Sequence, residues 1–276
     1  MHVVTSGRDR PGARASLARN DSAPRDWRSE SLGSLYRLAR TYRGGGELFT
    51  TRVSDPLGSW VAAVAIRFHI HPTVVTITDL GLAIVASTLV ITQADHLQSG
   101  WAPGLVALLF WQLVYILDCA DGQIARATGK TSSFGARVDV LVDFLVQITI
   151  VAALMTVLTQ RVTPPVALVV FGSIVWPLGI LIFILARDDG NKGHSFKRGG
   201  VVSVVKLIRD NGVRLLVVGL WLFFHPQSIV IPVAAISAVN ACVLVACIGR
   251  EAYLSMHVGS DLDPIEEEEE EEVAKP

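Results

Sequence analysis

Long apolar stretches alternate with short polar segments along the chain, and this pattern predicts helices that cross a membrane. Five stretches have about the length of a span: residues 74–92, 102–117, 138–158, 165–186 and 229–248. About 20 residues at 1.5 Å rise per residue cross a hydrocarbon core of roughly 30 Å. A sixth, shorter stretch at 213–224 is expected to begin earlier, near Asn211. We therefore expect an all-α integral membrane protein with six transmembrane helices in a bundle.

The positions of the 24 lysines and arginines agree with six spans. Eleven precede the first span, three lie between the second and third, seven lie between the fourth and fifth, and two follow the sixth. Only Arg161 falls in a loop on the opposite side. Basic residues favour the cytoplasmic side of a membrane. We therefore expect a multi-pass protein of a bacterial plasma membrane, with both termini in the cytoplasm.

The segments outside the spans differ in composition. Residues 1–45 are rich in arginine and lack an apolar run, which predicts a disordered tail, either solvated or attracted to anionic lipid. Residues 46–71 are apolar but interrupted, and Trp60 and Arg67 suit the headgroup zone, so we expect an interfacial amphipathic helix there. The transmembrane domain is then 72–250. Residues 251–276, which include seven consecutive glutamates, predict an acidic disordered tail.

The histidines and cysteines carry little evidence of a metal site. His69 and His71 are two apart, a spacing that suits a strand, so loop or interface positions are favoured over ligation of a metal. Cys119, Cys242 and Cys247 lie in apolar sequence without a pairing pattern, and we expect them to be reduced.

Four aspartates stand at the ends of two apolar stretches. Asp118 and Asp121 are three apart at the end of the second span, and Asp139 and Asp143 are four apart at the start of the third. Residues at these spacings share a helix face, so the two pairs can converge. Carboxylates in a membrane are costly, so a positive partner is expected. Oxygen ligands favour Mg²⁺ or Mn²⁺, and clustered carboxylates suit a site for two ions.

Small and basic residues between the aspartates extend this interpretation. Gly122, Ala125 and Gly135 leave room for a ligand beside the helix backbone, and Arg126 suits a phosphate. Metals, phosphate and a membrane together indicate phosphoryl-group transfer on a lipid. The alternative is a cation or proton-coupled transporter that uses intramembrane aspartates. Transporters usually place such residues near the middle of the membrane, whereas here they cluster at helix ends.

Residues 118–143 read D-x2-D-G-x2-A-R-x8-G-x3-D-x3-D. This pattern resembles the defining motif of the CDP-alcohol phosphotransferases, also called CDP-alcohol phosphatidyltransferases, over roughly residues 50–250. The resemblance implies a six-helix bundle, usually a homodimer, with an active site that faces the cytoplasm. Such enzymes act in phospholipid biosynthesis: they transfer a substituted phosphate from a CDP-linked donor, commonly CDP-diacylglycerol, to an alcohol and release CMP.

The resemblance also implies roles for single residues. Asp118, Asp121 and Asp139 would hold the metal ions, and Asp143 would be the general base while also touching a metal. The pocket for the donor's cytidine diphosphate would be lined by Gly122, Ala125 and Arg126. Gly135 would permit close helix approach.

A second match lies at the start of the first span. Residues 71–81 resemble the family's P-N-x-x-T helix start, with Pro72 and Thr76 in place and Thr73 where asparagine or aspartate is usual. Thr73 can still cap a helix, and Thr76 is expected at the substrate site. Asp79 is either a fifth acidic group of the site or a first-turn aspartate favoured by the helix dipole.

The sequence says least about the acceptor alcohol. The run DVLVDF at 139–144 matches no acceptor-specific pattern of the family. The basic residues of 194–210 predict an anionic acceptor if they bind its phosphate, but they equally suit ordinary positive charge on the cytoplasmic side. These residues are Lys197, Arg198, Lys206 and Arg209.

Overall fold

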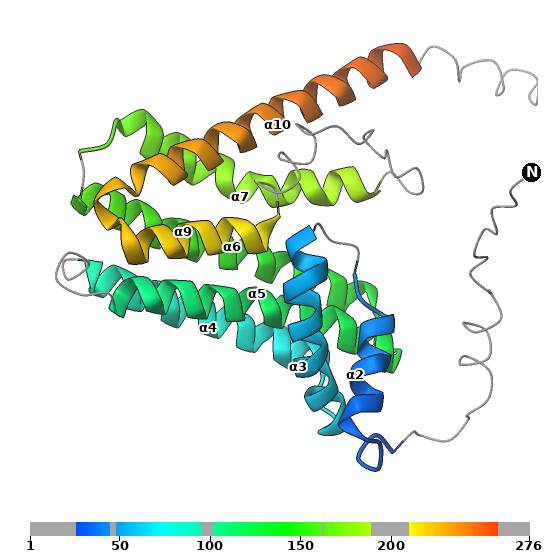
Figure 1. Cartoon of the computed structure of the whole chain (residues 1–276). Coiled ribbons are helices and arrows are strands. Elements are labelled where there is room, and N and C mark those ends of the chain that lie inside the picture. The colour runs from blue at the N-terminus through cyan, green and yellow to red at the C-terminus, as the bar shows by residue number, and fades with distance from the viewer. Residues whose placement is uncertain (1–25, 45–47, 95–101, 162, 189–209, 259–276) are drawn as a thin grey trace, which may run out of the picture.

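The computed structural model is all-helical (Figure 1). It describes residues 26–44, 48–94, 102–161, 163–188 and 210–258, and it has no strand among them. The elements in chain order are α2 (Leu32–Thr41), the π-helical turn η1 (Thr50–Ser54), α3 (Asp55–Arg67), α4 (Pro72–Thr92), α5 (Ala102–Thr128), α6 (Ser133–Arg161), α7 (Val166–Asp188), α9 (Asn211–Phe224), the 3-10 turn η3 (Pro226–Ser228) and α10 (Val230–Val258).

Four segments are long and apolar enough to cross a membrane. They are Pro72–Thr92, Gly104–Thr128, Ser133–Gln160 and Pro226–Gly249. Helix α7 covers Val166–Asp188, close to the predicted stretch at 165–186, and the shorter α9 covers Asn211–Phe224. Among the described residues, four of the six predicted spans are therefore candidates to cross a membrane by length and composition. The expected start of α9 at Asn211 is confirmed.

Helix α4 lies against the two helices that carry the motif. It packs against both α5 and α6, while α5 also packs against α3 and α9. Glycines allow the close approach of α5 and α9: a Cβ added at Gly104 would lie 2.6 Å from the Cα of Phe223, and one at Gly219 would lie 2.7 Å from the Cα of Leu108. Small residues at such contacts let helix backbones approach each other in membranes. The position of α5 is thus constrained from several sides.

The turn between α5 and α6 contains a glycine and a serine with defined roles. Gly129 has a φ of 69°, and the backbone N–H of Lys130 donates to the carbonyl of Ala125 at 2.9 Å. This bond and the left-handed glycine are typical of a helix that ends in a Schellman motif. Ser132 then caps α6, because its Oγ accepts from the backbone N–H of Gly135 at 2.9 Å.

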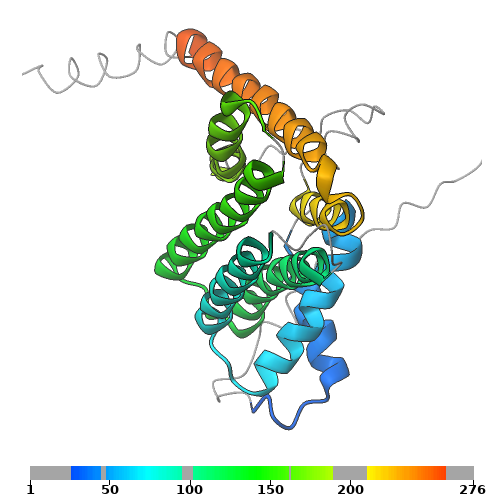
Figure 2. The same ribbon diagram turned by 90° about the vertical axis from the view of Figure 1, so that its left-hand side faces the viewer.

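The segments on either side of the transmembrane domain depart from the predicted tails. The predicted disordered tail to residue 45 is wrong for residues 32–41, which form α2 with Leu35 and Ala39 buried. Helix α2 packs on α3, and both run crosswise to α4 and α5 (Figures 1 and 2). At the other end, α10 continues to Val258, past the predicted boundary at 250.

Candidate active site

Five aspartates from three helices lie near one another; Asp79 and Asp121 are buried, and the other three are half-buried. The carboxyls of Asp118 and Asp143 lie within hydrogen-bonding reach of each other, which brings α5 and α6 together at this point. The negative charge of Asp118 also acts on Asp79 of α4 and Asp121 of α5, and the charge of Asp139 acts on Asp118 and Asp143. We call this group the acidic cluster; its members are Asp79, Asp118, Asp121, Asp139 and Asp143.

Thr76 joins α4 to the acidic cluster. Its Oγ1 donates to Oδ2 of Asp121 at 2.6 Å, and its side chain is buried. The start of α4 is capped by His71, whose Nδ1 accepts from the backbone N–H of Thr73 at 3.3 Å. Thr73 is therefore not the capping residue. The expected position of Thr76 beside the motif agrees with its contact to Asp121.

Asp79 is the member of the acidic cluster that the sequence left undecided. It lies beyond the first turn of α4, so the helix dipole does not account for it. Its side chain is only 2% exposed, and among the described residues its Oδ1 has no hydrogen-bond partner. The charges of Asp118 and Asp121 act on Asp79, because α4 lies against both motif helices. The available sequence signal was the spacing of three residues from Thr76, which places both on one helix face.

Gly122 and Arg126 are neighbours in space as well as in the motif. A Cβ added at Gly122 would lie 3.0 Å from both terminal guanidinium nitrogens of Arg126. The Nε of Arg126 donates to the carbonyl of Tyr42 at 2.7 Å. Gly122 thus lets the guanidinium lie against the backbone of α5, and Arg126 is held at the end of α2.

Gly135 lies in the cap of α6. Among the described residues, a Cβ added there would meet only the Oγ of Ser132, at 3.0 Å. That Gly135 permits the close approach of another helix stays a prediction. Its small size preserves the cap of α6. Ala125 lies on α5 one residue before Arg126 and is partly exposed.

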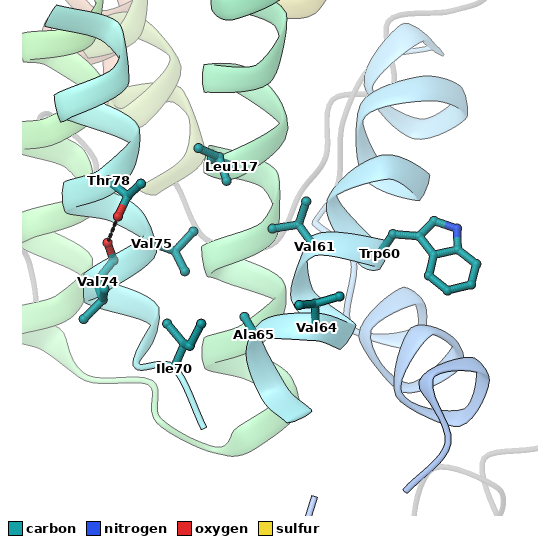
Figure 3. Close-up of a pocket in the computed structure, with 9 residues that line it drawn as sticks. All are labelled: Trp60, Val61, Val64, Ala65, Ile70, Val74, Val75, Thr78 and Leu117. Atoms are coloured by element: carbon teal, nitrogen blue, oxygen red, sulfur yellow. Dashed lines mark hydrogen bonds between the residues drawn. The ribbon is translucent and has the colours of Figure 1, made fainter. Parts of the chain in front are cut away.

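A pocket of about 490 Å³ with apolar walls lies between α3, α4 and α5 (Figure 3). Leu117 in its wall is one turn from Asp121 on α5, and Val75 is one turn from Asp79 on α4. The walls and the acidic cluster therefore share the same two helices. The lining residues are Trp60, Val61, Val64, Ala65, Ile70, Val74, Val75, Thr78 and Leu117.

The chemistry of the acidic cluster fits a divalent cation. Carboxylate oxygens are the ligands that Mg²⁺ and Mn²⁺ prefer, and Asp79 offers a buried oxygen that no described residue hydrogen-bonds. Two carboxylates in contact, such as Asp118 and Asp143, repel each other unless a proton or a cation lies between them. Within the described ranges, no three His, Cys, Asp or Glu side chains are yet arranged as a metal site. Side-chain rotation would have to bring the oxygens to a common point.

The remaining predicted residues lie outside the acidic cluster. His69 and His71 are exposed loop and cap residues, which agrees with the position predicted for them. The three cysteines are free. The basic residues Lys197, Arg198, Lys206 and Arg209 lie outside the described residues.

Comparison with known proteins agrees with this geometry. Residues 69–248 match the family CDP-alcohol phosphatidyltransferase, and this region is more than half of the chain. A comparison with curated proteins finds no match. The matched region contains Thr76, Arg126 and the whole acidic cluster, together with the helices that hold them. Motif, fold and site thus agree, and the chain belongs to the CDP-alcohol phosphatidyltransferase family.

Proposed function

We propose that the protein transfers a phosphatidyl group from CDP-diacylglycerol to an alcohol, with release of CMP, as a step in phospholipid biosynthesis. Family membership implies transfer from a CDP-linked donor to an acceptor, and the long apolar helices suit a lipid substrate. The observation that carries the proposal is the acidic cluster, in which the motif aspartates of α5 and α6 meet beside Thr76 of α4.

The metal ions belong in this cluster. The family is generally dependent on divalent metals, and we propose that Asp118, Asp121, Asp139 and Asp143 hold one or two Mg²⁺ or Mn²⁺ ions. Bound ions of this kind neutralise the diphosphate and stabilise charge on the leaving CMP. The hydrogen bond from Thr76 orients the Asp121 carboxylate.

Asp143 is the proposed general base. A neutral alcohol is a weak nucleophile, so a carboxylate within reach must take its proton as the new bond forms. In this step the acceptor oxygen bonds to the lipid-bearing phosphorus, the bond from that phosphorus to the CMP oxygen breaks, and Asp143 receives the hydroxyl proton. Asp118 lies within hydrogen-bonding reach of Asp143, so a proton or a cation between the two carboxyls would hold them in place.

The donor is proposed to extend from the motif into the apolar cavity. Arg126, with Gly122 and Ala125 beside it, binds the diphosphate, and the cavity between α3, α4 and α5 receives an acyl chain. Apolar walls suit a lipid chain because burial of its methylene groups is favourable. We also propose six membrane spans, a cytoplasmic site and a homodimer, from the distribution of basic residues and from the resemblance.

The test is release of CMP by the purified protein in vesicles that contain CDP-diacylglycerol and Mg²⁺ or Mn²⁺, with one candidate acceptor at a time. We expect one acceptor to support release, and Asp143→Asn to lower the rate by about a thousandfold. Anionic and neutral acceptors are compared in parallel, because the basic residues of 194–210 suit either an anionic acceptor or ordinary positive charge on the cytoplasmic side. Cation flux across the vesicles, with no release of CMP in the presence of any acceptor, would show instead a transporter.

A further inference from the structure

The motif of α5 is bonded to helices that precede the region matching the family. Gln123 follows Gly122 in the motif and is fully buried. Its Oε1 accepts from the Oγ of Ser59 at 2.8 Å, and its Nε2 donates to the backbone oxygen of Asp55 at 3.2 Å. A second bond from Nε2 reaches Oδ1 of Asp55 at 3.4 Å. Each polar atom of the Gln123 side chain is therefore bonded to α3.

Asp55 connects this contact to α2. Its carboxylate is 3% exposed and lies 4.0 Å from NH1 of Arg40. NH2 of Arg40 donates to the carbonyl of Thr51 at 3.1 Å, which ties α2 to the chain just before α3. Burial raises the pKa of Asp55, and the positive charges of Arg40, Arg43 and Arg126 act against that rise. Asp55 thus lies among three arginines, one of them in the motif.

The C-terminal end of α2 also contacts Arg126 directly. Tyr42 is the residue that caps this end, and its carbonyl accepts from Nε of Arg126 at 2.7 Å. A Cβ added at Gly44 would lie 3.7 Å from the guanidinium, so the chain passes close beside it. Carbonyls at a helix C-terminus carry partial negative charge and attract a cation. Arg126 is therefore held between the end of α2 and the backbone of α5.

We propose that α2 is a positioning element of the active site, in which Arg40 and Asp55 fix Gln123 while the end of α2 fixes Arg126. The inference rests on the proposed function, because Arg126 is taken to bind the donor's diphosphate. A free arginine side chain loses up to about 2 kcal/mol of rotamer entropy when a ligand immobilises it. An arginine that is already held loses less on binding, so α2 increases affinity for the donor.

The test is Arg40→Met in the full chain, measured as KM for each substrate and as binding of CMP to the purified protein. We expect the KM for CDP-diacylglycerol to rise, and CMP binding to weaken, by about three- to tenfold. The KM for the acceptor and the kcat at saturating donor should change by less than about twofold. Arg37→Met is the matched control, since Arg37 is exposed on the same helix and its Nε bonds only within α2, to the carbonyl of Gly33.

Equal effects on both substrates, or equal effects of Arg40→Met and Arg37→Met, would overturn the proposal. Should Arg40→Met fail to fold because it leaves Asp55 buried without its cation, the double variant Arg40→Met/Asp55→Asn carries the test, since it removes both charges. Arg40→Lys should recover part of the affinity because it keeps the positive charge. Wild-type protein that releases no CMP contradicts the proposed function, whereas normal release with unaltered donor KM in Arg40→Met contradicts only the role of α2.

Discussion

Two clusters of polar side chains reach α6 one helical turn apart. They differ in how their polar atoms are hydrogen-bonded. The acidic cluster reaches α6 at Asp143, and the second group reaches it at Gln147. In the second group Nε1 of Trp176 donates to Gln147 at 3.0 Å, while Gln147 and Arg214 both donate to Oδ1 of Asn211, at 3.3 and 2.8 Å. We call these four residues the amide cluster.

The difference separates a structural group from a functional one. Three hydrogen bonds join the side chains of the amide cluster, so it stabilises the contact of α6, α7 and α9 without any ligand. The acidic cluster consists of like charges, and Asp79 has an oxygen without a hydrogen bond from any described residue. Buried like charges and buried oxygens without hydrogen bonds lower the stability of the fold unless a ligand binds them. The comparison predicts opposite results when each cluster is changed.

Removal of divalent metal should have the largest effect and should act on the acidic cluster alone. We expect dialysis against EDTA to abolish CMP release, and added Mg²⁺ or Mn²⁺ to restore it. Metal should also raise the thermal unfolding midpoint of the wild type, because a ligand that binds only the folded state stabilises it. The same rise should be absent in Asp118→Asn. Full activity in EDTA would contradict a metal role for the cluster.

Asp79→Asn should have an intermediate effect on kcat/KM. The amide keeps the shape of the side chain but removes a charge beside Asp118 and Asp121, so we expect kcat/KM to fall about ten- to a hundredfold. The thermal midpoint should stay the same or rise, since repulsion among buried carboxylates is reduced.

Ser87→Ala is the matched control for Asp79→Asn. Ser87 is also buried on α4, about two turns further along, and its Oγ has no hydrogen-bond partner among the described residues. We expect it to leave kcat/KM within about twofold of the wild-type value. Equal activity of Asp79→Asn and Ser87→Ala would exclude Asp79 from the site.

Gln147→Leu should have the smallest effect on activity and a clear effect on stability. Leucine fills a similar volume but leaves Trp176 and Asn211 without their bonds to Gln147, which should lower stability by about 1–2 kcal/mol. The kcat/KM of the folded fraction should remain within about threefold of the wild-type value. Ile148→Leu, on the exposed face of the same helix, is the control for stability. A large loss of kcat/KM at normal stability would place Gln147 in the active site.

Much of the site could be predicted from the chain because its information is local. The spacings of Asp118, Asp121, Asp139 and Asp143 define helix faces, and Gly129 and Ser132 mark the turn between them. That the Oγ of Ser132 lies beside Gly135 could not be predicted, because it depends on the rotamer of Ser132. The bounds of α7 and α9 agree closely with the predicted stretches, but apolar composition does not by itself show whether a helix is buried in lipid or in protein.

The sequence by itself determined the helical class, the membrane character and the residues of the motif, because periodicity, apolar length and spacing are properties of one segment at a time. Only the tertiary structure decided that Asp79 belongs to the acidic cluster and that Arg126 meets Tyr42. Both results depend on contacts between distant segments: α4 packs against α5 and α6, and α2 lies beside the end of α5. No spacing within a single helix encodes such contacts, since they arise from packing of all the apolar faces together.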